Sequence, residues 1–267
     1  MRLRTITTAL LILYAALTAY LILSYPLGFD TPSFFTPLLT LLAFVFAGLH
    51  AGQTLGWRRG ALLLALTFSV SLAFESAGVA TGLIYGPYHY TDLLGPKFLG
   101  LVPYLIPLAW FMMVYPSYVI VSRLAPPGWK PWAWRLGAAA LGGVVMTAWD
   151  VAMDPLMVAG GNWVWEVKGA YFGVPLQNYW GWWLTTFATF FLFVWLGRLG
   201  PAQRVPDQSR FEQLAVYSYI ITGLGSVLLG LEHNLGGAAL AGLFAMLPWM
   251  LLGLRAQPQV VPEGNYC

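Results

Sequence analysis

Residues 136–158 read LGAAALGGVVMTAWDVAMDPLMV, an apolar run that nevertheless contains two aspartates. Roughly 20 consecutive apolar residues are enough for a helix to cross the hydrocarbon core of a bilayer. Asp150 and Asp154 are four residues apart, about one helical turn, so we expect both carboxyl groups on one face of this helix. Pro155 lacks a backbone donor and disfavours helical geometry in the residue before it, so we expect the helix to kink or end there.

The rest of the chain is equally apolar. Of its 267 residues, 59% are hydrophobic and only 9% are charged, and the mean hydropathy is +0.70. A soluble globular protein carries about 25% charged residues. The strand-like alternation of a membrane barrel is absent. We therefore predict an all-α fold, a polytopic transmembrane helix bundle that forms a single integral membrane domain over residues 1–267.

Eight apolar segments are long enough to span the bilayer. The second segment is short and the connection at 231–235 is tight, so a count of seven spans stays open. The first segment differs from a signal peptide because its apolar run is too long and no small-x-small cleavage site follows it. The predicted spans are 6–24, 34–50, 60–84, 100–122, 136–158, 180–198, 212–231 and 235–254.

The basic residues assign an orientation to these spans. Of the 13 Lys and Arg residues, all but Lys97 and Lys168 fall at the N-terminus, in the even-numbered connections or in the C-terminal tail. The positive-inside rule then places both termini in the cytoplasm. The net charge of +3 is spread over several connections, so we do not expect a nucleic-acid partner.

Two acids lie deep within predicted spans. Measured from the cytoplasmic ends of their helices, Glu75 lies at roughly 22 Å and Asp150 at roughly 21 Å. An ionised carboxylate there costs about 2.5–3.5 kcal/mol, and the sequence offers no Arg or Lys at the same depth. Such surroundings favour a protonated acid beside a carboxylate, which is a proton donor with a base at hand. Helix-to-helix hydrogen bonding by these acids, without a catalytic role, is the alternative.

Polar and aromatic residues gather near these acids in the outer connections 85–99 and 159–179, and Trp110 and Trp149 lie deeper within the neighbouring spans. We predict that they form a substrate site. We assign Trp180, Trp182 and Trp183 instead to the aromatic belt of the membrane interface. The predicted substrate-binding residues are Tyr85, Tyr88, His89, Tyr90, Trp110, Trp149, Asn162, Trp163, Trp165, Tyr171 and Asn178.

The sequence contains no metal or cofactor motif. Its three histidines form neither an HxxxH pair nor an HExxH motif, and its one cysteine, Cys267, is the last residue. No dinucleotide fingerprint, phosphate loop or serine-nucleophile motif is present. We therefore predict neither a metal site nor a bound cofactor.

Two sequence blocks resemble a known family. They are FESAGVATGLIYGPYHYTDLLGPKFLGLVPYLIPLAW (74–110) and AWDVAMDPLMVAGGNWVWEVKGAYFGVPLQNYWGW (148–182). The combination of ExxGxxTGxxYGxYxY, WDxxMDP and YFGVPxxN resembles the CruF-type carotenoid 1′,2′-hydratases, a family that includes the bisanhydrobacterioruberin hydratases of archaea. The resemblance covers about residues 60–200.

The resemblance implies an activity and its setting. The activity is hydration of the terminal double bond of an acyclic carotene to a tertiary alcohol, without an organic cofactor, by a multi-pass protein of a prokaryotic cell membrane. The implied partners are a lipophilic carotenoid substrate and membrane lipid, with other enzymes of carotenoid biosynthesis as further candidates.

This chemistry assigns roles to the buried acids. An isolated alkene is a very weak base, so its hydration needs a strong carboxylic acid in dry surroundings, aromatic faces that stabilise a carbocation, and a base that orients water. Our hypothesis makes Asp150 the proton donor, Asp154 the water-orienting base and Glu75 a coupled partner. The three roles remain interchangeable on the sequence alone.

Other functions stay open. A membrane carotene cyclase, or another isoprenoid-modifying enzyme, would begin with the same protonation. A proton-coupled transporter or a carotenoid-binding membrane protein would also carry intramembrane acids. We find none of the inverted repeats that many transporters show.

Overall fold

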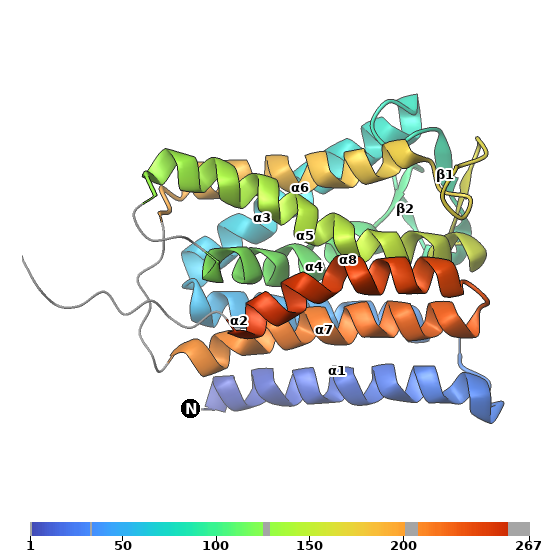
Figure 1. Ribbon diagram of the computed structural model, residues 1–267, viewed down its shortest axis with the longest axis horizontal. Coiled ribbons are helices and arrows are strands. Elements are labelled where there is room, and N and C mark those ends of the chain that lie inside the picture. Colours follow the sequence, from blue (N-terminus) through green and yellow to red (C-terminus); the bar gives the residue numbers. More distant parts are fainter. Residues whose placement is uncertain (1, 33, 125–128, 201–207, 256–267) are drawn as a thin grey trace, which may run out of the picture.

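The computed structural model describes residues 2–32, 34–124, 129–200 and 208–255, so Cys267 lies outside the described part. The described residues form eight α-helices that run side by side along one axis (Figure 1). Their bounds are α1 (Arg2–Leu27), α2 (Phe35–Thr54), α3 (Trp57–Thr81), α4 (Leu105–Arg123), α5 (Pro131–Ala159), α6 (Leu176–Leu196), α7 (Gln208–Glu232) and α8 (Gly236–Arg255).

The predicted helix bundle is confirmed. Each of the eight apolar segments contains one helix, and seven of these helices are long and apolar enough to cross a membrane. The helix outside those seven is α6, a 21-residue helix that is rich in Trp and Thr. The protein is therefore a multi-pass membrane protein.

The fourth span begins later than predicted. Residues 100–104 precede α4, and part of this stretch belongs to a short hairpin of β2 (Lys97–Phe98) and β3 (Val102–Pro103). Val102 and Pro103 of this hairpin are apolar and buried, which is why the stretch resembles the start of a span in the sequence.

Of the two outcomes expected at Pro155, a kink or an end of the helix, the second is excluded, since α5 continues to Ala159. A proline removes the hydrogen bond to the carbonyl group four residues earlier, here that of Val151. The hydroxyl group of Tyr171 donates to this carbonyl oxygen at 3.1 Å. The side chain from the following connection therefore replaces the bond that Pro155 cannot make.

The charged residues separate along the bundle as predicted. Arg4 lies over the ring of Phe211, and Arg123 donates to the Gly253 carbonyl oxygen at 3.0 Å, at the end where Arg2 and Arg255 also lie. Lys97 and Lys168 belong to the opposite end, which carries the short strands (Figure 1). This separation fits the predicted orientation, in which the strand-bearing end faces away from the cytoplasm.

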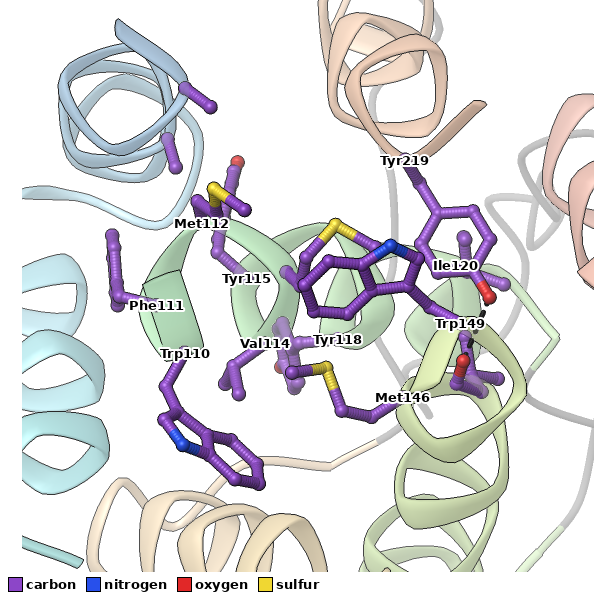
Figure 2. Packing of buried hydrophobic residues seen from close by; sticks show 14 of the residues in the cluster. Trp110, Phe111, Met112, Val114, Tyr115, Tyr118, Ile120, Met146, Trp149 and Tyr219 are labelled. Atoms are coloured by element: carbon purple, nitrogen blue, oxygen red, sulfur yellow. Dashed lines mark hydrogen bonds between the residues drawn. The ribbon is translucent and has the colours of Figure 1, made fainter. Parts of the chain in front are cut away.

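Helix α5 is central because small residues let neighbouring helices approach it closely. A Cβ atom on Gly142 would lie 2.0 Å from the ring of Phe190 in α6, and one on Gly242 of α8 would lie 2.4 Å from the Cβ atom of Ala152. Figure 2 shows how Met146 and Trp149 of α5 pack beside the buried side chains of α4. These contacts fix the rotation of α5 about its own axis. They therefore also fix the direction in which the side chains of Asp150 and Asp154 point.

The outer cap contains a two-stranded antiparallel sheet, β1 (Tyr88–Tyr90) paired with β4 (Trp163–Trp165). It joins the connection after α3 to the connection after α5. Helix α3 ends at Thr81 and is followed by the cap residue Gly82, whose positive φ of 69° suits glycine. Because successive strand residues point to opposite faces, Tyr88 and Tyr90 are buried while His89 between them is exposed.

We predict that Gly142→Leu destabilises the bundle. The added side chain would overlap the buried ring of Phe190, and overpacking of this kind costs about 1–3 kcal/mol. The apparent melting temperature of the detergent-solubilised protein, followed by circular dichroism, should fall. Gly48→Leu in α2 is the matched control, because a Cβ atom there meets nothing within 4 Å. Equal melting temperatures for the two variants would contradict the close approach of α5 and α6.

Candidate active site

A cavity of about 410 Å³ lies within the outer part of the bundle. The β1–β4 sheet contributes one wall, and helices α1 to α7 contribute the others. Two of the three predicted acids, Glu75 and Asp154, line this cavity together with Asn162 and Asn178. The volume is within the range of sites for small molecules.

Glu75 is surrounded by hydrogen-bond donors. Its side chain projects from α3 and is only 3% exposed. The hydroxyl groups of Tyr88 and Tyr90 donate to Oε2, the second at 2.9 Å, and Nε1 of Trp110 donates to Oε1 at 2.9 Å. A carboxylate accepts such bonds at both oxygens, so three donors fit an ionised Glu75 without a cation.

The two tyrosines are suited to donate. Burial, together with the negative charge of Glu75, raises the pKa of both Tyr88 and Tyr90 well above the usual value for a phenol. They therefore keep their protons at any physiological pH and direct them at the carboxylate.

Asp150 and Asp154 form a pair that shares one donor group, as their predicted position on one helix face requires. The amide nitrogen of Asn178, in the first turn of α6, donates to Oδ2 of Asp150 at 2.8 Å and to Oδ2 of Asp154 at 2.5 Å. Nε1 of Trp163 donates to Oδ1 of Asp154 at 2.6 Å. Two buried carboxyl groups so close together resist double ionisation, which favours one proton held by the pair.

The two aspartates differ in their access to the cavity. Asp154 lines it, whereas Asp150 is fully buried and does not. Oδ1 of Asp150 is a buried oxygen without a hydrogen-bond partner among the described residues. Asp150 therefore lies behind Asp154 and Asn178, seen from the cavity.

No cation neutralises these acids in the described part of the chain. Lys97 pairs with Asp92 at 2.8 Å, and Arg123 lies 3.8 Å from Glu212 at the far end of the bundle. Glu75 and the aspartate pair depend instead on neutral donors from the outer cap and from α4 and α6.

The β1–β4 sheet connects the two sets of acids. Tyr90 and Trp163 are cross-strand partners, and their rings lie 5.7 Å apart in an edge-to-face arrangement. Tyr90 donates to Glu75, and Trp163 donates to Asp154. The register of one short sheet thus positions the donors of both carboxyl groups.

Aromatic rings form the walls between the acids. Trp110 stacks on Trp182 at 4.3 Å, and Trp149 meets the edge of Trp182 at 5.8 Å. Tyr88 lies 4.9 Å from Trp165 on the side of the sheet. Because the face of an aromatic ring attracts positive charge, these walls are able to stabilise a cation that forms inside the cavity.

Most of the predicted substrate-binding residues line the cavity. They are Tyr85, Tyr88, Tyr90, Trp110, Trp149, Asn162, Trp163, Trp165 and Asn178. His89 does not line it, because the pleat of β1 turns its side chain outward, 3.4 Å from Glu166. Tyr171 does not line it either, because its hydroxyl group is bound to Val151.

The assignment of Trp182 to the interfacial belt is wrong. Its side chain is buried in the cavity wall, whereas that of Trp180 is exposed. The spacing contains a signal for this difference, since Asn178, Trp182 and Thr185 share one helix face. The sequence analysis also did not predict that Tyr14, Thr222 and Ser226 line the cavity. A hydroxyl group in an apolar helix does not indicate which neighbour or cavity its side chain faces.

No group of three His, Cys, Asp or Glu side chains that could hold a metal ion occurs among the residues the structure describes. Glu75, Asp154 and Asn178 all line the cavity, and their polar groups form hydrogen bonds with other side chains of its wall. The arrangement can provide a proton, accept one and stabilise positive charge in apolar surroundings.

Comparison with known proteins identifies the family. Residues 35–248 match a family model described as carotenoid biosynthesis protein. The chain is 36% identical over 151 residues to the bisanhydrobacterioruberin hydratase of Haloarcula japonica, an alignment that covers 56% of this chain and 50% of that protein. The chain thus spans about half the length of this relative, and no solved structure matches it. The family resemblance of the two motif blocks is confirmed, and the chain belongs to the carotenoid biosynthesis protein family.

Proposed function

We propose that the protein hydrates the terminal trisubstituted double bond of an acyclic carotene, in a prokaryotic cell membrane, and so acts as a hydro-lyase of the carotenoid 1,2-hydratase type. The observation that carries this proposal is that two buried carboxyl groups, those of Glu75 and Asp154, face an aromatic cavity with no cation beside them among the described residues. The hydratase name of the Haloarcula japonica relative supports it.

The first step is protonation of the alkene. We assign the donor role to Asp154, in place of Asp150, because Asp154 lines the cavity and Asp150 lies behind it. The proton joins the less substituted carbon, and the two electrons of the double bond form the new C–H bond. A tertiary carbocation remains on the neighbouring carbon. The second carboxyl group keeps a proton available at Asp154, since both cannot ionise easily.

The second step is capture of the cation by water. The rings of Trp110, Trp149 and Trp182 stabilise the positive charge until the water oxygen bonds to the cationic carbon. The water then loses a proton to Glu75, whose three donors hold it as a carboxylate. Return of that proton to Asp154 through solvent restores the starting state.

A carotene cyclase remains the second candidate, because it would start from the same cation. It would quench the cation with an internal double bond and would exclude water. The amide groups of Asn162 and Asn178 at the cavity wall favour entry of water and thus hydration.

Expression in a lycopene-producing bacterium should convert the pigment into products that are heavier by one water molecule per reacted end. Mass spectrometry of the extracted carotenoids measures this directly. A product of unchanged mass but altered retention would contradict hydration and support cyclisation. Unaltered lycopene would contradict both reactions on this substrate.

Asp154→Asn should lower hydration by at least about 100-fold, because a general acid contributes at least this much. The amide keeps the shape of the side chain, so the folded yield should be unchanged. Asp150→Asn should retain more activity than Asp154→Asn, since Asp150 does not meet the substrate. The control is Asp92→Asn in the outer cap, where the carboxyl group is exposed. Full activity of Asp154→Asn would exclude it as the donor.

A further inference from the structure

The cavity extends beyond the acids. On the side away from Glu75 it continues between α1, α2 and α7, where its lining includes Thr18 and Leu21 of α1, Leu39 of α2, and Gly225 and Leu229 of α7. We call these five residues the α1 arm of the cavity. The α1 arm contains no acid and no cation.

We infer that the α1 arm binds the polyene chain next to the reacting end group, so that its residues determine the length of substrate the enzyme accepts. This inference rests on the proposed function. It assigns the reacting end of the carotene to the space between Glu75 and Asp154, and the adjoining chain to the space along α1.

The α1 arm joins the acid end of the cavity beside Trp149. Nε1 of Trp149 donates to Oγ of Ser226 at 3.0 Å, while its ring meets that of Trp182 at the acid end. Ser226 follows Gly225 directly, so one indole ring borders both parts of the cavity. A substrate whose end group contacts Trp149 therefore has its chain directed at α1 and α7.

Most hydroxyl groups along the α1 arm are bonded within the protein and do not require a polar ligand, although Oγ1 of Thr18 is buried without a hydrogen-bond partner among the described residues. Oγ1 of Thr222 donates to the Ser218 carbonyl oxygen at 2.9 Å and also contacts the hydroxyl group of Tyr14 at 2.8 Å. Ser226 and Thr40 likewise donate to carbonyl oxygens of their own helices. Side chains bonded in this way present mainly carbon to the cavity, which suits a hydrocarbon better than an ion or a file of water.

Gly225 leaves room in the α1 arm that a larger residue would fill. A Cβ atom on Gly225 would lie 3.1 Å from Cγ2 of Thr18 on the facing helix. A conjugated chain is straight and stiff, so it cannot bend around an added side chain here. Small changes of volume in the α1 arm should therefore act on long substrates.

Helix α1 also separates the α1 arm from the outside of the bundle. It packs mainly against α2 and α7, and it lies at the edge of the bundle (Figure 1). Its opposite face carries exposed apolar side chains such as Ile12, Leu13 and Leu23. A chain longer than the cavity thus has only one helix between it and the bilayer, where a carotene is soluble.

The test uses Leu21→Trp, which enlarges a side chain of the α1 arm, and Leu23→Trp, a matched control on the exposed face of the same helix. Each full-length protein is assayed with lycopene and with a fifteen-carbon acyclic terpene that has the same terminal alkene. We expect Leu21→Trp to lower the ratio of lycopene to short-substrate hydration at least about tenfold, the effect of an overpacking cost near 1.4 kcal/mol. The control should keep the ratio of the wild type.

A second measurement is independent of hydration. Lycopene that co-purifies with each protein is quantified by its absorbance, and Leu21→Trp should retain less of it than the wild type and Leu23→Trp. An equal loss of hydration with both substrates, or unchanged lycopene retention, would overturn the inference. If the wild type retains lycopene but hydrates nothing, the proposed function fails, and retention by the two variants alone decides the role of the α1 arm.

Discussion

The site depends on the pairing of β1 with β4 in the outer cap. Glu75 and Asp154 are almost fully buried and have no cation beside them among the described residues. Neutral donors must satisfy these carboxyl groups, and the sheet provides several such donors: Tyr88 and Tyr90 from β1, and Trp163 from β4. A shift of β1 by one residue would turn Tyr88 and Tyr90 outward, as His89 is turned now. The cap is thus both the lid of the cavity and the element that positions its acids.

The helices were predictable because a bilayer imposes a strong and local rule on sequence. Apolar length and the distribution of Arg and Lys are properties of single segments, so no knowledge of packing was needed. The hydrogen bond that replaces the one lost at Pro155 was not predictable, because it comes from Tyr171, which lies sixteen residues further along the chain. The sheet was missed for the same reason. Its strands are three residues each and lie in connections on either side of α4 and α5, with no turn signal to join them.

In the candidate site, too, the features set by one helix were predictable, and those set by contacts between helices were not. The spacing of Asp150 and Asp154 predicted one helix face, and the shared bonds to Asn178 agree with it. Which of the two meets the cavity depends on how α5 is rotated, and that rotation is fixed by contacts such as Gly142 with Phe190 and Gly242 with Ala152. Helix periodicity alone leaves this rotation undetermined. Periodicity alone likewise did not separate the buried Trp182 from the exposed Trp180 on the same helix.

The central claim is that the aspartate pair holds a proton while Glu75 is ionised. Infrared spectroscopy of the purified protein at neutral pH tests it, because a protonated carboxyl group has a carbonyl stretching band distinct from that of a carboxylate. The account predicts that this band is present in the wild type and in Glu75→Gln, and is absent from the double variant Asp150→Asn/Asp154→Asn. A band that disappears in Glu75→Gln, or persists in the double variant, would contradict it.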